Sequence, residues 1–174
     1  MGRTGVTTIT QQKPNEQEHG PVEVRPAREG DIDALLTVEQ QCFDVYYYGR
    51  YKLNRYDFHC YLENTRCIFL VAARDSRTIG YILGPADSWR LPGTAHIDSI
   101  AVLPPVQGQG IGTQLLLSFI EDARGRGCKK VTLEVATANS VGLAFFTKHG
   151  FRELRKLPHY YGRNLHGLFM SADI

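Results

Sequence analysis

The segment from Ile97 to Thr113 reads Ile-Asp-Ser-Ile-Ala-Val-Leu-Pro-Pro-Val-Gln-Gly-Gln-Gly-Ile-Gly-Thr, and the rest of the chain is arranged around it. Its first six residues, up to Val102, predict a strand, which two prolines end because proline cannot donate a hydrogen bond to a sheet. Three alternating glycines follow. Apolar side chains then recur at helical spacing up to about Arg126, which predicts an amphipathic helix.

The glycine-rich turn joins a strand to the start of a helix, so several backbone amides and the positive end of the helix dipole point at one place. Glycine has no Cβ and lets an anion approach closely. The plain alternative is a connecting turn that happens to be rich in glycine. A Walker A loop is excluded because Thr113 follows Gly112 with no lysine, and a dinucleotide fold expects its glycines near the start of the chain.

The motif Gln107-x-x-Gly110-x-Gly112 closely resembles the pyrophosphate loop of the GNAT family of N-acetyltransferases, which hold acetyl-CoA there. Gln107, where an arginine is common, is within the family's usual range. The resemblance implies that the strand residues Ile100, Ala101 and Val102 bond the pantetheine arm. It also implies that the loop and the first helical turn take the pyrophosphate, through Gly108, Gln109, Gly110, Ile111, Gly112 and Thr113.

Length and composition are those of an ordinary globular domain, with 174 residues, 43% hydrophobic and 22% charged, and a net charge of +2. Residues 1–20 are polar, so we expect a disordered tail before one domain at 21–174. No run is apolar enough to span a membrane, and no signal peptide is visible. The four cysteines lack metal or redox spacing, so we expect buried thiols in a reducing cytoplasm.

Hydrophobic patterning predicts the remaining elements. Strands are expected over 22–26, 67–73, 78–83, 130–135, 151–157 and 165–172, with a hairpin turn at 75–77 and a loop over 84–94. Helices are expected from Asp31, as cap, to about residue 42, and over 138–149, capped by Asn139 or Ser140. With the family resemblance, this pattern predicts an α/β GNAT fold. Its mixed, mostly antiparallel sheet carries helices on both faces and is splayed at the acetyl-CoA strand.

The stretch from Phe43 to Tyr61 is aromatic and charged, and five tyrosines precede residue 57. Aromatic side chains with hydroxyl groups suit a binding surface. A short helix packed on the sheet explains the same pattern, and the two interpretations are compatible. In the GNAT family this region borders the groove for the acceptor substrate.

Glu134 is the candidate catalytic base. In the strand 130–135, Thr132 and Glu134 point away from their apolar neighbours. If the strand is central, the carboxylate faces a crowded side of the sheet. It can then take the proton that an ammonium group must lose before it attacks an acyl carbon. The alternative is a solvated glutamate near the end of a strand.

The second half of the chain resembles the RimI-type protein N-acetyltransferases, which acetylate the N-terminal amine of a ribosomal protein or of other proteins. The matching segments are Leu133-Glu-Val135, Ala138-Asn139, Ala144-Phe-Phe146, Lys148-His-Gly-Phe151 and His159-Tyr-Tyr161. This resemblance implies that Glu134 is the proton acceptor and that Asn139 contacts the pantetheine.

Phe146 departs from the family pattern. A tyrosine usually stands at this position and protonates the departing CoA thiolate, which a phenyl ring cannot do, so Phe146 is assigned to cofactor binding alone. Tyr161 is the candidate donor and Tyr160 the alternative. The thiolate can also leave unassisted, because a thiol with a pKa near 8.5 is a tolerable leaving group.

The sequence therefore predicts an acyltransferase that moves an acetyl group from acetyl-CoA to a primary amine by direct attack. A protein or peptide N-terminus is the first candidate acceptor, and a lysine side chain or a small-molecule amine is the second. The rival from another class is an acyl-CoA sensor without turnover, suggested by Phe146. We expect no metal, nucleic acid or membrane partner, and a monomer or homodimer in the cytoplasm.

Overall fold

The computed structural model describes residues 20–43, 52–88 and 91–174. The tail expected at 1–20, except for Gly20, lies outside the described residues. So do residues 44–51, which hold four of the five tyrosines that precede residue 57, and Trp89. No helix of the described part is long and apolar enough to cross a membrane.

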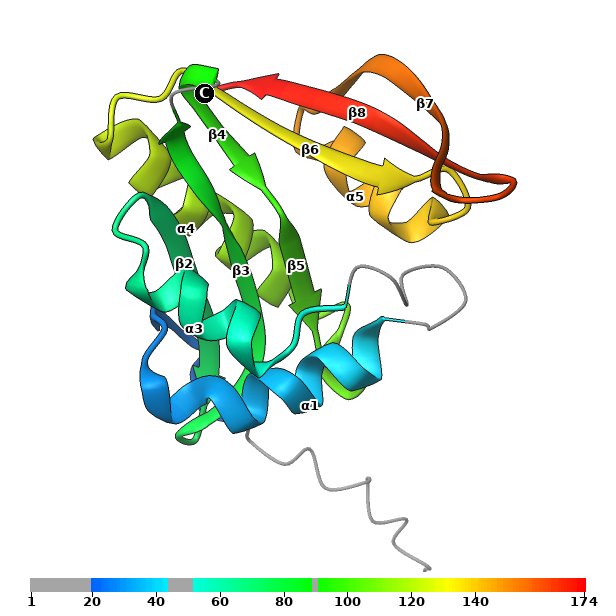
Figure 1. Cartoon of the computed structure of the whole chain (residues 1–174). Helices are drawn as coiled ribbons and strands as arrows, with labels where there is room; N and C mark the ends of the chain where they lie inside the picture. The colour runs from blue at the N-terminus through cyan, green and yellow to red at the C-terminus, as the bar shows by residue number, and fades with distance from the viewer. Residues whose placement is uncertain (1–19, 44–51, 89–90) are drawn as a thin grey trace, which may run out of the picture.

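An eight-stranded sheet forms the centre of the molecule (Figure 1). Its strands are β1 (Glu23–Pro26), β2 (Cys67–Arg74), β3 (Arg77–Ser88), β4 (Leu91–Ile97), β5 (Ser99–Val102), β6 (Lys130–Ala136), β7 (Arg152–Gly162) and β8 (Leu165–Asp173). The spatial order is β1-β2-β3-β4-β6-β8-β7, and β5 pairs with β3. Among these pairings β4–β6 is parallel and the others are antiparallel.

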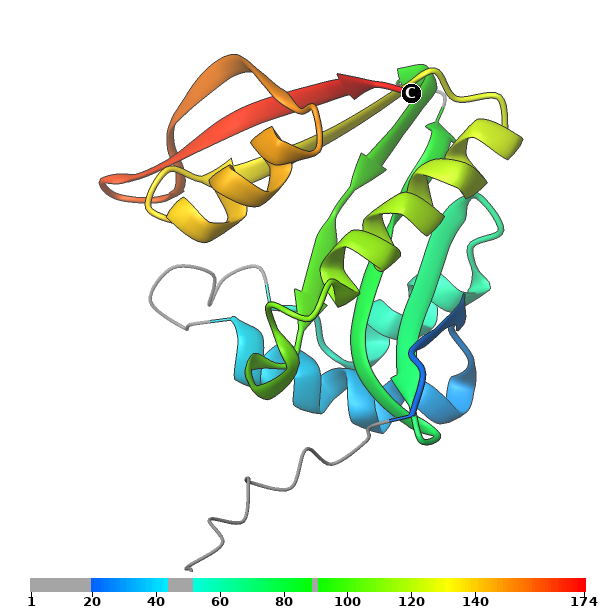
Figure 2. The same ribbon diagram turned by 180° about the vertical axis from the view of Figure 1, so that it is seen from behind.

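Helices cover both faces of the sheet, as Figures 1 and 2 show. The helices α1 (Ile32–Cys42) and α3 (Arg55–Glu63) pack over one hydrophobic cluster, and α4 (Ile111–Gly125) and α5 (Ser140–Lys148) over the other. Two short 3-10 turns, η1 (Glu29–Asp31) and η2 (Pro104–Val106), precede α1 and α4. The predicted α/β fold with a mostly antiparallel sheet is confirmed.

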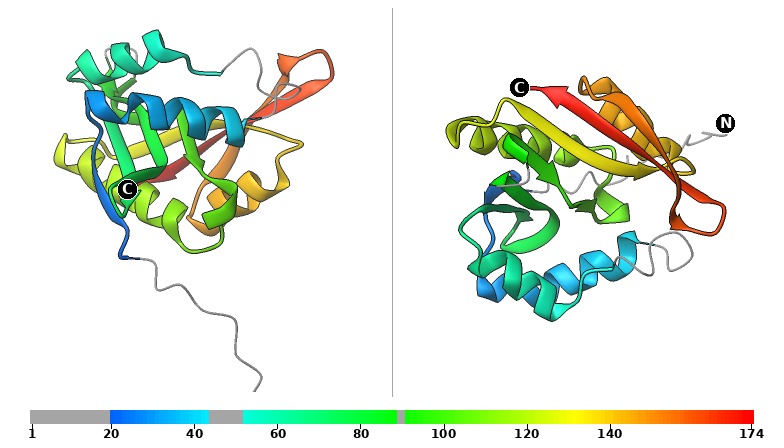
Figure 3. Two further views of the ribbon diagram at one scale, coloured as in Figure 1. Left: turned by 90° about the horizontal axis from the view of Figure 1, so that it is seen from below. Right: turned by 45° about the horizontal axis from the view of Figure 1, so that its top comes forward.

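The sheet is splayed in the middle. The strands β4 and β6 pair from Thr94 with Lys130 to Ile97 with Leu133. Beyond that point β5 stays with β3, while β6 continues along β8, so the two halves of the sheet diverge (Figures 1 and 3). The splay lies beside β5, as the sequence predicted.

The single strand predicted over 97–102 is wrong, because the chain breaks at Asp98 into β4 and β5. The physical reason lies on β3. A Cβ built on Gly84 would stand 1.8 Å from the carbonyl oxygen of His96, so only glycine permits this close approach. The Asp98 N–H donates to the Leu83 carbonyl at 3.0 Å, which fixes the break.

The loop predicted over 84–94 is also wrong in large part. The strand β3 continues to Ser88, and β4 begins at Leu91. Ala86 pairs with Ala95, so the main chain of this segment finds hydrogen-bond partners in the sheet despite two prolines. Pairing with a neighbouring strand here outweighs the local preference of the residues.

Asp31 stands at the N-cap of α1, but its side chain does not cap the helix. The carboxylate instead accepts two hydrogen bonds from the Arg25 guanidinium at 2.8 Å, one from the Arg28 amide at 2.8 Å and one from the Thr78 hydroxyl at 2.9 Å. A bidentate arginine is a stronger partner than a helix amide. Asp31 therefore ties β1, η1 and β3 together.

The four cysteines are free thiols. Cys128 is buried as expected, whereas Cys60 is exposed and Cys42 and Cys67 are half-buried. The expectation of four buried thiols is therefore wrong, most clearly for Cys60, which lies on α3.

Candidate active site

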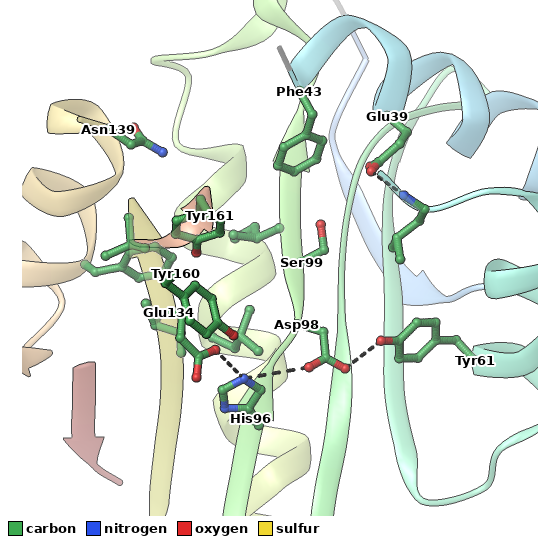
Figure 4. A pocket seen from close by; sticks show the side chains of 16 residues that line it. Glu39, Phe43, Tyr61, His96, Asp98, Ser99, Glu134, Asn139, Tyr160 and Tyr161 are labelled. Carbon is green, nitrogen blue, oxygen red and sulfur yellow. Dashed lines mark hydrogen bonds and ion pairs between the residues drawn. The ribbon is translucent and has the colours of Figure 1, made fainter. Parts of the chain in front are cut away.

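A cavity of about 370 Å³ lies in the splay of the sheet (Figure 4). Its walls come from α1, α3, β4, β5, β6, α5 and β7. Six residues singled out from the sequence line it: Ile100, Glu134, Asn139, Phe146, Tyr161 and the alternative donor Tyr160. The cavity between the diverging strands therefore has the predicted base, Glu134 on β6, on one wall. The strand that was expected to bind pantetheine, β5, forms another wall.

The strand β5 has one ladder partner among the described strands, β3, so its second edge faces the splay. An extended amide chain such as pantetheine fits an unpaired strand edge, because main-chain groups are its natural partners. Ala101 is buried, and Val102 is half-buried. The Val102 carbonyl accepts from the Gln107 side chain at 2.8 Å and from the Cys42 thiol at 3.2 Å.

The glycine-rich loop has the conformation that its sequence requires. Gly108 and Gly110 adopt φ of +77° and +81°, in the left-handed region that favours glycine. The helix α4 begins at Ile111, whose side chain is buried in the core, so only its backbone amide can face a ligand. The amides of the first turn have no acceptor inside the helix, which fits an anion.

Arg74, at the end of β2, lies against this loop. Its Nη2 donates to the Gln109 side-chain oxygen at 2.9 Å. Its Nε and Nη1 are buried and have no hydrogen-bond partner within the described residues. A cation with two unused donors beside the loop fits a pyrophosphate. Sequence reasoning missed Arg74, because the hairpin that carries it lies far from the loop along the chain.

Glu134 on β6 meets His96 on β4 (Figure 4). The Glu134 Oε2 lies 2.9 Å from the His96 Nε2, and the two side chains are 22% and 19% exposed. The parallel register places His96 beside Thr132, whose hydroxyl lies 2.8 Å from the His96 Nδ1. Both ring nitrogens of His96 therefore have a partner.

The proton positions follow from these contacts. A bare Nε2 would face a carboxylate oxygen, so Nε2 carries a proton and donates to Glu134. In neutral His96 the Nδ1 then accepts from the Thr132 hydroxyl. In the imidazolium both nitrogens donate, and the Thr132 hydroxyl turns to the Ala95 carbonyl, 3.4 Å away. The site accommodates both charge states of His96.

Two opposing effects act on the pKa of His96. Burial lowers it, but the hydrogen bond and charge of Glu134, together with the charge of Asp98, outweigh burial, so the pKa of His96 is raised. Partial burial raises the pKa of Asp98, against the Tyr61 hydrogen bond and His96. The Tyr61 hydroxyl donates to Asp98 Oδ2 at 2.6 Å.

A second polar group lies on the opposite wall of the cavity. Glu39 on α1 is buried, which raises the pKa of its carboxyl, and it accepts from the Leu53 amide at 2.8 Å and from the Tyr81 hydroxyl. The Tyr81 hydroxyl also lies 2.8 Å from the Ser99 hydroxyl. These contacts tie α1 and the Leu53 amide to β3 and β5.

Sequence reasoning missed His96, Asp98, Tyr61 and Glu39. One signal was present, since His96 and Asp98 alternate just before β5 as Thr132 and Glu134 alternate on β6. That spacing could have indicated polar side chains on one side of a strand. Their meeting with Glu134 depends on the register between β4 and β6.

The other predicted residues lie as follows. Tyr160 and Tyr161 reach the cavity from β7 beside Glu134 (Figure 4), and Tyr160 is 40% exposed. Asn139 caps α5, because its side-chain oxygen accepts from the Gly142 amide at 2.8 Å. Phe146 is buried, and its ring lies 5.4 Å from that of Phe151 between centroids. Phe146 thus packs in the core and borders the cavity.

Comparison with known proteins shows which family this chain resembles in sequence. Residues 32–151 match the model of the Acetyltransferase (GNAT) family. An uncharacterised N-acetyltransferase of Methanocaldococcus jannaschii is 34% identical over 139 residues, 79% of this chain and 83% of the relative. An N-alpha-acetyltransferase of Sulfurisphaera tokodaii is 30% identical over 161 residues, 87% of this chain and 92% of the relative.

Solved structures share the fold. The ribosomal-protein-S18-alanine N-acetyltransferase from Escherichia coli has a TM-score of 0.76 at 20% identity and covers 88% of this chain and 94% of its own. The family match spans more than half of the chain, from the start of α1 through the loop, β6 and α5. This chain therefore belongs to the GNAT family and is an acetyl-CoA-dependent N-acetyltransferase.

Proposed function

We propose that the chain acetylates the α-amine of a protein or peptide N-terminus, in the manner of the RimI-like enzymes, with Glu134 as proton acceptor. The observation that carries this proposal is the Glu134–His96 pair in the cavity beside the open edge of β5. The acceptor class is supported by relatives named N-alpha-acetyltransferase and by a Bacillus subtilis relative, 27% identical, named as a putative ribosomal-protein-alanine N-acetyltransferase.

The lining of the cavity suits an amine that arrives as an ammonium. Three carboxyl groups, Glu39, Asp98 and Glu134, line it, and none of its lining residues within the described chain is lysine or arginine. Glu134 Oε2 is engaged by His96, which leaves Oε1 to accept the amine proton, directly or through one water. The deprotonated amine then attacks the thioester carbon without a covalent enzyme intermediate.

Acetyl-CoA is the cosubstrate, and its binding residues are part of the proposal. The edge of β5, from Ile100 to Val102, takes the pantetheine amides. The loop amides from Gly108 to Thr113 take the pyrophosphate, with Arg74 beside them. Asn139 and Phe146 border the pantetheine from α5, and Tyr161 is the candidate donor to the departing thiolate.

We further propose that the enzyme works in the cytoplasm, because four free thiols suit a reducing compartment. The partners are then acetyl-CoA and a protein or peptide that presents its N-terminus to the cavity.

A panel of three acceptors with labelled acetyl-CoA tests the function. The first is a lysine-free peptide with a free N-terminus, the second the same peptide with a blocked N-terminus and one lysine, and the third a small diamine. We expect label on the first peptide at the highest kcat/KM. Label confined to the second or third acceptor would instead assign a lysine or small-molecule acetyltransferase.

Calorimetry with CoA accompanies the panel, because it separates binding from turnover. CoA binding without transfer to any of the three acceptors, over a range of pH, would favour the sensor and contradict the proposed reaction.

A further inference from the structure

A continuous row of polar side chains crosses the cavity from α3 to β6 (Figure 4). Tyr61 donates to Asp98 Oδ2 at 2.6 Å, Asp98 Oδ1 lies 3.7 Å from His96 Nε2, and His96 Nε2 lies 2.9 Å from Glu134 Oε2. The reaction proposed above uses Glu134 and its hydrogen bond from His96. Asp98 and Tyr61 have no part in it so far.

In this row, the Nε2–H group of His96 lies between the carboxylates of Glu134 and Asp98. His96 Nε2 donates to Glu134, and Asp98 Oδ1 faces the same nitrogen from the other side at a longer distance. Asp98 is held at both ends, since its side chain accepts from Tyr61 and its amide donates to the Leu83 carbonyl at 3.0 Å. It therefore stays aimed at His96 rather than turning into solvent.

A proton on Glu134 changes this balance. Once Glu134 has taken the amine proton, its carboxyl is a weaker acceptor, because charge-assisted hydrogen bonds are the strong ones. The Nε2–H of His96 then has only a neutral carbonyl oxygen as partner on that side, in a site that is largely shielded from water. Asp98 is the remaining carboxylate within reach.

We propose that Asp98, oriented by Tyr61, is a positioning residue that receives the Nε2–H hydrogen bond of His96 when Glu134 becomes protonated. One N–H bond of the ammonium breaks, its electron pair stays on nitrogen as the lone pair that attacks, and one O–H bond forms on Glu134. His96 keeps its protons and exchanges one hydrogen-bond acceptor for another, so nothing is oxidised or reduced. The inference rests on the proposed role of Glu134. It assigns Asp98 and Tyr61 a role in the state after Glu134 has taken the proton.

The surroundings of His96 agree with this exchange. Glu134 faces it from β6, and Asp98 faces it from the break between β4 and β5. Among the described residues that line the cavity, the other titratable groups are acids: Tyr61 on α3, Glu39 on α1, and Tyr160 and Tyr161 on β7. Behind them, Cys67 on β2 and Asp57 on α3 act on Tyr61, and Lys52, which does not line the cavity, acts on Glu39. Arg126 acts on Cys67 from the end of α4 and does not line the cavity. A negative carboxylate at Asp98 therefore favours the imidazolium and its donated hydrogen bond.

The test combines NMR titration of the His96 ring in the free enzyme with steady-state kinetics. In Asp98→Asn we expect the His96 titration to move to lower pH by about half a unit or more, because one of its two carboxylates is gone. We expect kcat to fall about tenfold with little change in the acceptor KM, since a step after binding is affected. Tyr61→Phe should shift both quantities in the same direction by less.

Asp173→Asn is the matched control, because Asp173 is an exposed residue at the end of β8 and should change neither quantity. An unchanged His96 titration, or an unchanged kcat, in both Asp98→Asn and Tyr61→Phe would overturn the proposal. Tyr61→Phe retains the Asp98 side chain, so it provides the test of the proposal if Asp98→Asn does not fold. Full activity of Glu134→Gln would instead refute the base, and the His96 titration in the free enzyme distinguishes the two failures.

Discussion

At the scale of single residues, the site depends on which atoms already have partners. Glu134 gives one oxygen to His96, which orients the carboxylate and leaves the other oxygen toward the cavity. His96 in turn is fixed by Thr132 on the neighbouring strand. A general base must be held in place and must have an unprotonated oxygen. The contacts between β4 and β6 hold the Glu134 carboxylate in place.

Glu134→Gln keeps the size of the side chain and its hydrogen bond from His96 but removes the basic oxygen. We expect kcat to fall on the order of a hundredfold, the lower end of the range for general base catalysis. CoA affinity, measured by calorimetry, should stay the same. Glu153→Gln, an exposed change on β7, is the control. Wild-type turnover in Glu134→Gln at neutral pH would remove Glu134 from the mechanism.

Phe146 and Tyr161 can be tested together. Tyr161→Phe should lower kcat about tenfold with little effect on the acceptor KM if its hydroxyl protonates the thiolate. Phe146→Tyr, added to that variant, puts a hydroxyl at the cavity wall on α5 and should restore part of kcat. A rise in KM alone in Tyr161→Phe, with no rescue, would assign Tyr161 to acceptor binding.

At the scale of elements, the loop before α4 and the hairpin of β2 and β3 meet around Gln109 and Arg74. We predict that Arg74→Met weakens CoA binding about tenfold, because it removes a cation beside the pyrophosphate and the partner of Gln109. Binding of acetyl-pantetheine, which has no phosphates, should not change. Arg77→Met removes an exposed arginine from the same hairpin and is the control. Equal weakening of both ligands would indicate a general loss of structure.

The break between β4 and β5 is the element that positions His96 and Asp98. Gly84→Ala would place a Cβ against the His96 carbonyl, so the strands must move apart. We expect a loss of about 1 to 3 kcal/mol in the free energy of unfolding, the usual cost of overpacking, and a lower kcat. Gly125→Ala, where nothing lies within 4 Å of the new Cβ, should leave both nearly unchanged. Urea denaturation and steady-state kinetics measure the two effects, and an unaltered Gly84→Ala protein would contradict this account.

At the scale of the whole molecule, two hydrophobic clusters hold helices on opposite faces of the sheet. A part-buried ion pair joins the N-terminal edge of the sheet to η1, the turn before α1. The Arg25 hydrogen bonds hold the pKa of Asp31 below its usual range, outweighing burial, with help from the Arg28 amide and Thr78. A lowered folded pKa stabilises the fold above the unfolded value, and that stability is lost as pH falls through the folded pKa.

Asp31→Asn should therefore lower the free energy of unfolding by about 2 to 4 kcal/mol near neutral pH, because it leaves Arg25 without its charged partner. The difference from wild type should shrink as pH falls below about 3.8, where Asp31 is neutral in the unfolded chain. Asp33→Asn removes an exposed acid whose partner Arg55 is also exposed, so it should cost less than about 1 kcal/mol. A pH-independent difference in urea denaturation would refute the linkage.

The sequence by itself determined what depends on neighbours along the chain. Apolar spacing marked α4 and its buried face, the alternating glycines marked the turn before it, and Asn139 or Ser140 marked the start of α5, where the structure has Asn139 as the cap. The family and the cosubstrate followed from the same local motif. These features are local because helix periodicity, capping and the conformation of glycine are set within a few residues.

Only the tertiary structure decided what depends on strand pairing. The break at Asp98 arises because β3 brings Gly84 against His96, and no pattern within 97–102 contains that contact. The hydrogen bond from His96 to Glu134 likewise requires the parallel register of β4 with β6, and Tyr61 reaches Asp98 from a helix 37 residues earlier. A register shift of one residue reverses which face a strand side chain occupies, so the candidate active-site cavity is a property of the assembled sheet.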